Sequence, residues 1–271
     1  MKLRSHIGIW SLIFVPYVVI VLVGLGYVSL PALMHPNKPA IWSAWQAPDL
    51  DTIPPDQSGD SIRYGLHLFR ETPWYAPQFT GNRLSCSDCH IGDGIAPYAS
   101  PMVGLPALFP MYNKRAGHVI SLKDRIQECF TRSENGRPLP YDGREMRALV
   151  AYIEWLSQPE PGHKPFAGRG LMKLPPMHAD PKHGEQIYAM QCAGCHGADG
   201  SGSRPLMPAL WGPESFNDGA GMNGISKMAR FVQFNMPQNR RGMLSAQEAY
   251  DVAAYIHAQP RPPFNPAYKG Y

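Results

Sequence analysis

The 271-residue chain lacks a strong excess of charge of either sign. Lysine and arginine together number 25 against 21 aspartates and glutamates, which gives a formal net charge of +4. Nucleic-acid-binding proteins carry a much stronger basic signal, so we expect no nucleic-acid partner. The mild basic excess suits an anionic substrate or an acidic redox partner without requiring either.

Strand-like alternation of apolar and polar residues is also scarce. The chain instead contains 29 prolines and 26 glycines, which indicate long ordered loops and a modest helix content. Its length is enough for one or two domains. We therefore predict a mainly α fold in which loops wrap around cofactors.

Cysteine is rare, but four of the five cysteines form two copies of one motif. The copies are Cys86-Ser87-Asp88-Cys89-His90 and Cys192-Ala193-Gly194-Cys195-His196. C-x-x-C-H is the spacing of a c-type haem attachment site, in which both thiols bond to the haem and the histidine is an axial ligand of the iron. Two zinc sites or disulfide clips are the alternatives, and the histidine that follows each motif disfavours them. We predict two covalently attached haem c groups.

The order of predicted helices around the two motifs is the same. Helical patterns are predicted over 61–70, 121–135 and 142–158 in the first half, and over 184–190, 226–235 and 245–259 in the second. This order is similar to that of the mono-haem cytochrome c fold used twice. The predicted organisation is a tether at 35–60, a first cytochrome c domain at 61–158, a linker at 159–182, a second cytochrome c domain at 183–260 and a tail at 261–271.

The first 34 residues form an anchor or signal segment. Lys2 and Arg4 precede residues 7–34, which contain no charged residue and no histidine. A run of this length can span a bilayer as a helix, and no clear cleavage site follows it. We therefore predict an uncleaved membrane anchor that places the remainder on the periplasmic side of the bacterial inner membrane. The alternative is a cleaved signal and a soluble periplasmic protein.

The second domain offers a methionine as the other axial ligand of its haem. Met236 follows His196 by 40 residues, in an Asn-Met-Pro turn that ends a predicted helix. A His/Met haem has a raised potential and passes electrons. Met222, Met228 and Met243 are the competing ligands.

At the corresponding place in the first domain stands the fifth cysteine. Cys129 follows His90 by 39 residues. Met102 and Met111 are the competing ligands, and an inert buried thiol or an intermolecular disulfide are the other interpretations of this cysteine. As a ligand, a thiolate would lower the haem potential and offer a sulfur nucleophile beside a redox centre. We predict His90/Cys129 ligation.

Cations and a hydroxyl group accompany this cysteine. Arg125 precedes Cys129 by four residues, on the same helical face, and Lys114-Arg115 lie in the preceding loop. Guanidinium groups bind oxyanions, although surface charges or haem-propionate partners are equally good interpretations. Ser133 is a catalytic candidate whose alternative is a turn or cap residue.

These residues carry a resemblance to a known family. The segment Arg125–Arg137, the preceding Asn113–Arg115 and the stretch 215–222 are similar to those of dihaem thiosulfate dehydrogenases, and the resemblance covers about residues 60–260. It implies that the first haem is the active site and that Arg115, Arg125 and Ser133 bind substrate around Cys129. It also implies that a His/Met second haem delivers electrons to an external acceptor, a cytochrome or another carrier.

The reaction implied by the resemblance joins two thiosulfates into tetrathionate. Cys129 would carry a sulfur adduct that a second thiosulfate displaces, as in thiol–disulfide exchange. Three alternatives stay open at this point. They are a membrane-tethered dihaem cytochrome that only transfers electrons, the same site working as a tetrathionate reductase, and a thiosulfate-binding cytochrome that works only within a larger complex.

Overall fold

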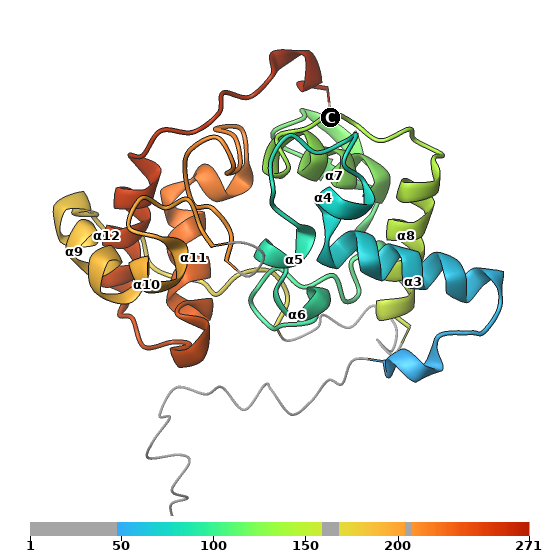
Figure 1. Ribbon diagram of the computed structural model, residues 1–271, viewed down its shortest axis with the longest axis horizontal. Coiled ribbons are helices and arrows are strands. Elements are labelled where there is room, and N and C mark those ends of the chain that lie inside the picture. Colours follow the sequence, from blue (N-terminus) through green and yellow to red (C-terminus); the bar gives the residue numbers. More distant parts are fainter. Residues whose placement is uncertain (1–47, 159–167, 204–206, 271) are drawn as a thin grey trace, which may run out of the picture. The chain divides into compact units, whose positions relative to one another are not determined.

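The structure is a computed structural model that describes residues 48–158, 168–203 and 207–270 (Figure 1). Within these ranges it is mainly helical, as predicted. The first half contains η2 (Leu50–Thr52), α3 (Gln57–Arg70), α4 (Thr72–Tyr75), α5 (Cys86–Cys89), α6 (Ile91–Gly94), η3 (Pro106–Leu108), β1 (Met111–Asn113), β2 (His118–Ile120), α7 (Leu122–Glu128), η4 (Cys129–Ser133) and α8 (Arg144–Leu156). The second half contains α9 (Pro181–Gln191), α10 (Ala193–His196), η5 (Gly221–Asn223), α11 (Ile225–Asn235), η6 (Gln238–Arg240), α12 (Ala246–His257) and η7 (Pro266–Tyr268).

Capping side chains set where several helices begin. The Asp56 carboxylate accepts hydrogen bonds from the amides of Ser58 and Gly59, so α3 begins four residues earlier than its apolar pattern predicts. Ser121 and Asp124 form a capping box at the start of α7, in which they exchange side-chain and backbone hydrogen bonds. Ser245 and Glu248 form the same arrangement at the start of α12.

Each half of the described chain buries its own core where a first helix crosses a closing helix. In the first half, α3 packs on α8, with Leu66, Phe69 and Tyr152 almost fully buried. In the second half, α9 and α11 pack on α12, and Tyr188 and Val252 lie in that core. The two packing units are visible in Figure 1 as α3 with α8, and as α9 and α11 with α12. The helical plan of the first motif is thus repeated around the second.

A glycine lies at each of these crossings. A Cβ atom on Gly65 would lie 2.1 Å from the carbonyl oxygen of Ala148, and one on Gly184 would lie 2.0 Å from that of Asp251. Both neighbours are backbone atoms of the closing helix, which cannot move aside without separating the helices. The close crossing therefore requires glycine at both positions.

We expect Gly65→Ala and Gly184→Ala each to destabilise the protein by about 2 kcal/mol or more, as overpacking of a tight contact does. Thermal unfolding of the haem-loaded variants measures the loss. Gly270→Ala is the control, because Gly270 lies outside both motifs and no atom lies within 4 Å of a Cβ at this position. Equal melting temperatures for all three variants would contradict this account of the crossings.

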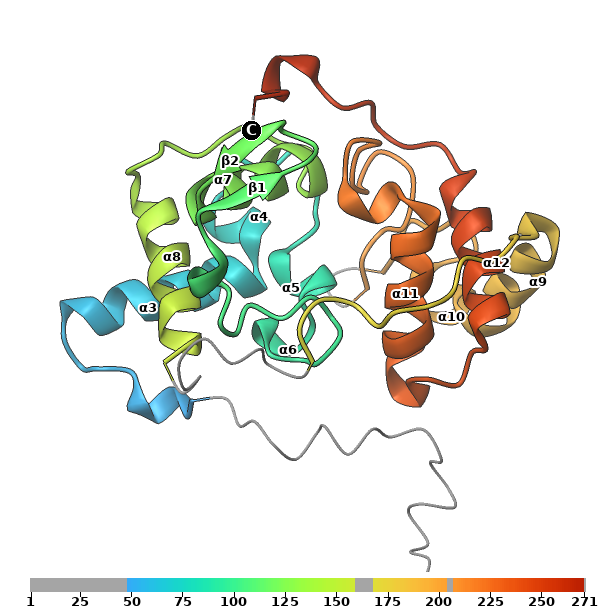
Figure 2. The same ribbon diagram turned by 180° about the vertical axis from the view of Figure 1, so that it is seen from behind.

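Two expectations about local structure need correction. Strand-like alternation is scarce in the sequence, yet β1 pairs antiparallel with β2 from Met111↔Ile120 to Asn113↔His118, beside α7 (Figure 2). Strands of three residues are too short to show alternation in the sequence. The helix predicted over 121–135 is regular only as far as Glu128, and a π-helical turn, η4, continues it from Cys129.

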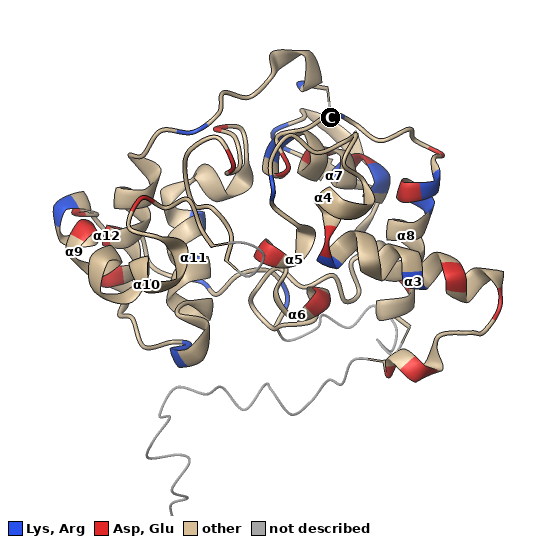
Figure 3. Ribbon diagram, viewed as in Figure 1, with Lys and Arg blue, Asp and Glu red and all other residues tan. Residues whose placement is uncertain are grey.

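Charged residues recur along α3 and α8, whereas α11 and α12 carry fewer of them (Figure 3). No helix in the three described ranges is both long and apolar enough to cross a membrane. The predicted anchor at 7–34 and the linker residues 159–167 lie outside those ranges. The anchor stays a prediction.

Candidate active site

The first C-x-x-C-H motif is held by its neighbours in a short helix, α5. The amide of Ser85 donates to the Asp88 carboxylate at 2.8 Å, and Thr72 Oγ1 lies 3.5 Å from Cys86 Sγ. His90 follows directly, and its Nδ1 lies 2.6 Å from the carbonyl oxygen of Ser100. The motif is therefore fixed at both ends before any cofactor is considered.

The histidines of both motifs have a backbone carbonyl oxygen next to Nδ1. His90 Nδ1 faces the Ser100 carbonyl, and His196 Nδ1 lies 3.0 Å from the carbonyl oxygen of Pro208. Because a carbonyl oxygen only accepts, Nδ1 carries the proton and Nε2 keeps its lone pair for a metal. Burial lowers the pKa of His90 to about 4 and also lowers the pKa of His196. Both imidazoles are therefore neutral at neutral pH, as an iron ligand must be.

A cavity of about 460 Å³ adjoins the first motif. Its wall includes Cys86, Cys89, His90 and Cys129, and its other lining residues are mostly apolar. This volume and lining are typical of a cofactor site. Burial raises the pKa of the Cys86 and Cys89 thiols, so these two positions disfavour thiolates and fit uncharged thioethers. The residues present therefore fit a covalently bound haem.

The alternative of a zinc site finds no support in the described ranges. No group of three or more histidine, cysteine, aspartate or glutamate side chains is placed there to hold a metal ion. Iron in a haem needs only two protein ligands, because the porphyrin supplies the others.

Cys129 lies where the helix changes its winding. It is the first residue of the π-helical turn, in which the amide of Glu134 donates to the Cys129 carbonyl at 2.9 Å. Such turns are frequent at functional sites. Arg125 Nη1 lies 3.4 Å from Cys129 Sγ, and the pKa of Arg125 is raised, chiefly by the charge of Cys129 and then by that of Glu128. The structure thus pairs the sulfur with a guanidinium.

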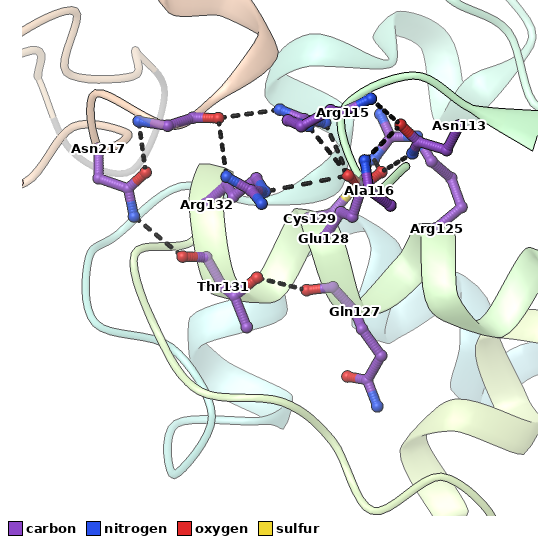
Figure 4. Close-up of polar contacts among 11 residues, drawn as sticks. Asn113, Arg115, Ala116, Arg125, Gln127, Glu128, Cys129, Thr131, Arg132 and Asn217 are labelled. Carbon is purple, nitrogen blue, oxygen red and sulfur yellow. Dashed lines mark hydrogen bonds and ion pairs between the residues drawn. The ribbon is translucent and has the colours of Figure 1, made fainter. Parts of the chain in front are cut away.

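The predicted site residues do not all line the cavity. Cys129, Arg125 and Ser133 are in its wall. Arg115 is instead bound to Glu128, with its Nε 3.0 Å and its Nη2 2.9 Å from Glu128 Oε1 (Figure 4). The backbone carbonyl of Ser133 accepts a hydrogen bond from the Asn82 side chain at 2.8 Å. Arg115 therefore contacts Glu128, the residue next to Cys129, and does not line the cavity itself.

The sequence argument missed two charged residues near this site, Glu128 and Lys227. Glu128 is 1% exposed, and Arg132 Nε lies 3.9 Å from its carboxylate. The pKa of Lys227 on α11 is lowered, first by desolvation and then by the nearby Arg115 and Arg125. The only sequence signal for Glu128 was its helical position next to Cys129, and Lys227 had no signal because it comes from the other half of the chain.

A segment of the second half contacts η4. The carbonyl oxygen of Gly219 accepts hydrogen bonds from Arg115 Nη1 at 2.9 Å and from Arg132 Nη1 at 3.4 Å. The side chain of Asn217, which is buried, donates to the Thr131 carbonyl at 2.9 Å (Figure 4). The arginines near Cys129 are thus held by both halves of the chain.

The second motif lies against the core of the second half. Met236 follows α11 directly and packs with Met222 against this core. Met228 is buried within α11, and Met243 is 43% exposed. This arrangement is compatible with Met236 as a ligand, which stays a prediction.

Two cytochrome c folds, each with its own attachment motif, define a dihaem c-type cytochrome with two covalently bound haems. The family described as "SoxA/TsdA, cytochrome c domain" matches residues 71–161, and "Cytochrome C oxidase, cbb3-type, subunit III" matches residues 179–256. These matches confirm the repeated cytochrome c fold and the two haem c groups predicted from the motifs.

Similarity to characterised proteins is more specific. The chain is 42% identical to thiosulfate dehydrogenase from Allochromatium vinosum, over 82% of this chain and 86% of that protein. It is 38% identical to thiosulfate dehydrogenase from Psychrobacter arcticus, over 83% and 70%. The chain therefore belongs to the thiosulfate dehydrogenase family of oxidoreductases.

A solved structure gives the same relation. Thiosulfate dehydrogenase (TsdBA) from Marichromatium purpuratum in its "as isolated" form matches with a TM-score of 0.77 and 36% identity, over 80% of this chain. The chain spans about half of that longer protein.

Proposed function

We propose that this protein oxidises two thiosulfates to one tetrathionate at Cys129 and passes the two electrons to an external acceptor. In this proposal His90 and Cys129 would hold the iron of the first haem, and His196 and Met236 would hold that of the second. The single observation that carries it is the placement of Cys129, paired with Arg125, in the wall of the cavity that contains the first attachment motif.

The sulfur chemistry balances in two steps. In the first, the Cys129 thiolate and the terminal sulfur of thiosulfate form a sulfur–sulfur bond and give up two electrons. In the second, another thiosulfate attacks the thiosulfate-derived sulfur of this adduct, tetrathionate leaves and the thiolate is regenerated. No proton is gained or lost in either step. When bound, each haem supplies a site for one electron.

The surrounding side chains hold the reactants. Arg125 binds the oxyanion end of thiosulfate and stabilises the thiolate as a leaving group, because its guanidinium lies against the sulfur. Arg115 adds positive charge from behind Glu128, and Ser133 contributes a hydroxyl group in the cavity wall. The mostly apolar lining of the cavity excludes water from the adduct.

The proposed location is the periplasmic side of the bacterial inner membrane. Covalent attachment of haem c takes place outside the cytoplasm, and residues 7–34 provide an apolar segment that exports or anchors the chain. A mildly basic protein suits an acidic cytochrome as its acceptor.

The proposal is tested with the purified holoprotein, thiosulfate and a ferricyanide acceptor. We expect two thiosulfates to disappear for each tetrathionate formed and two ferricyanides reduced. A cytochrome that only carries electrons would leave thiosulfate unconsumed, and a protein that needs a larger complex would be inactive alone. Either result would refute the proposal.

A further inference from the structure

Glu128 is a buried carboxylate that the proposed chemistry does not use. Its side chain is 1% exposed and directly precedes Cys129 in the chain. The coupling of two thiosulfates transfers no proton, so a carboxylate has no acid–base role in it. Moreover, a negative charge beside an anion-binding site opposes substrate binding. The presence of Glu128 needs another explanation.

The contacts of this carboxylate are with groups of the substrate site. Its Oε1 accepts from Arg115 Nε at 3.0 Å and lies 3.9 Å from Arg132 Nε. Its Oε2 accepts from Asn113 Nδ2 at 3.1 Å and lies 3.4 Å from Arg125 Nη1. Figure 4 shows these donors around Glu128. Asn113 and Arg115 come from β1 and the turn that follows it, Arg125 from α7 and Arg132 from η4.

Arg125 is held between the carboxylate and the sulfur. Its Nη1 lies 3.4 Å from Glu128 Oε2 and 3.4 Å from Cys129 Sγ. The three residues share one helical face, because Arg125 precedes the other two by three and four positions. A long side chain that is 40% exposed would otherwise sample many rotamers. The fixed carboxylate selects the one that faces the sulfur.

Arg115 is held at both ends of its guanidinium. Nε and Nη2 contact Glu128, while Nη1 donates to the Gly219 carbonyl at 2.9 Å. Glu128 therefore fixes two arginines at once, one on each carboxylate oxygen. Together with Arg132, three guanidinium charges surround one carboxylate, so the cluster keeps an excess of positive charge for an anionic substrate.

We propose that Glu128 is a positioning residue of the thiosulfate site, acting through Arg125 and Arg115. This inference rests on the function proposed above. Glu128 orients the two guanidinium groups relative to Cys129 Sγ. Its negative charge at the same time weakens the electrostatic binding of the anionic substrate.

Replacement by glutamine separates orientation from charge. Glu128→Gln keeps the shape of the side chain but removes one negative charge, so electrostatics alone would strengthen thiosulfate binding and lower its KM. Loss of orientation would instead lower kcat/KM. We expect kcat/KM for thiosulfate to fall by about 10- to 100-fold, the scale of a misplaced reacting group. Glu128→Asp, which keeps the charge on a shorter stem, should recover part of this loss.

A double-mutant cycle shows whether Glu128 acts through Arg125. Glu128→Gln should cost much less in an Arg125→Ala background than in the wild type, since the group that it orients is then absent. Asp142→Asn is the matched control, because Asp142 forms a surface pair with Lys123 and its side chain is 81% exposed. Its effect should be small and additive. Haem content and the melting temperature are measured for every variant.

Each outcome decides the inference. The inference is supported if the Glu128→Gln protein keeps both haems and its melting temperature, has a lowered kcat/KM, and shows a much smaller loss in the Arg125→Ala background. Unchanged or improved kcat/KM overturns it while leaving the proposed function intact, and so does a loss that is additive or accompanied by haem loss. A wild-type protein that does not oxidise thiosulfate overturns both.

Discussion

Cys129→Gly should abolish thiosulfate oxidation while both haems remain attached. The substitution removes the sulfur that lies beside Arg125 in the cavity, and with it both the proposed nucleophile and the proposed iron ligand. Removal of a covalent nucleophile lowers turnover by about 10³-fold or more. Thiosulfate-dependent reduction of ferricyanide by the holoprotein measures the loss, and the absorption spectrum of the first haem should change at the same time.

Two further variants make this result specific to the sulfur. Cys129→Ser keeps a polar atom of similar size and should be equally inactive, because a hydroxyl group does not form the sulfur adduct. Met111→Leu removes a competing ligand from the same cavity wall and should leave turnover within about twofold of the wild type. If activity survives Cys129→Gly and falls in Met111→Leu, the sulfur required for turnover is that of Met111 and the assignment to Cys129 is wrong.

The cofactor was predictable from the sequence because its signal is local. Five consecutive residues specify haem attachment, and the long amphipathic pattern of α8 is equally explicit, so its expected range of 142–158 differs from Arg144–Leu156 by only two residues at each end. Cys129 was found by its distance from His90, which repeats the spacing of Met236 from His196. Local motifs and fixed spacings of this kind can be recognised without the structure.

The rest of the site was not predictable because it depends on tertiary packing. From the sequence alone, Glu128 is interpreted as a solvent-exposed charge on a surface helix. Only its burial and its contact with Arg115 indicate a role in the site. The π-helical turn at Cys129 has no sequence pattern of its own. Gly219 supplies a backbone carbonyl to the site from about ninety residues away, a contact that no spacing rule indicates.

The second large effect concerns the division of labour between the two haems. We expect a Cys86→Ala/Cys89→Ala protein to lose thiosulfate oxidation altogether, since the cofactor of the catalytic cavity is no longer attached. A Cys192→Ala/Cys195→Ala protein should retain the reaction with thiosulfate but turn over at least about tenfold more slowly, because formation of the adduct releases two electrons and one haem accepts only one.

Haem counting and stopped-flow absorbance distinguish the two variants. Each protein should contain one covalent haem per chain, and thiosulfate should reduce the remaining haem only where Cys129 still faces it, in the second variant. This asymmetry is the strongest consequence of the proposed site, because both motifs have the same C-x-x-C-H spacing and only the proposed second ligands, Cys129 and Met236, assign the sulfur chemistry to the first haem. Wild-type turnover without the second haem would show that electrons leave directly from the first, and Met236 would then have no part in the route.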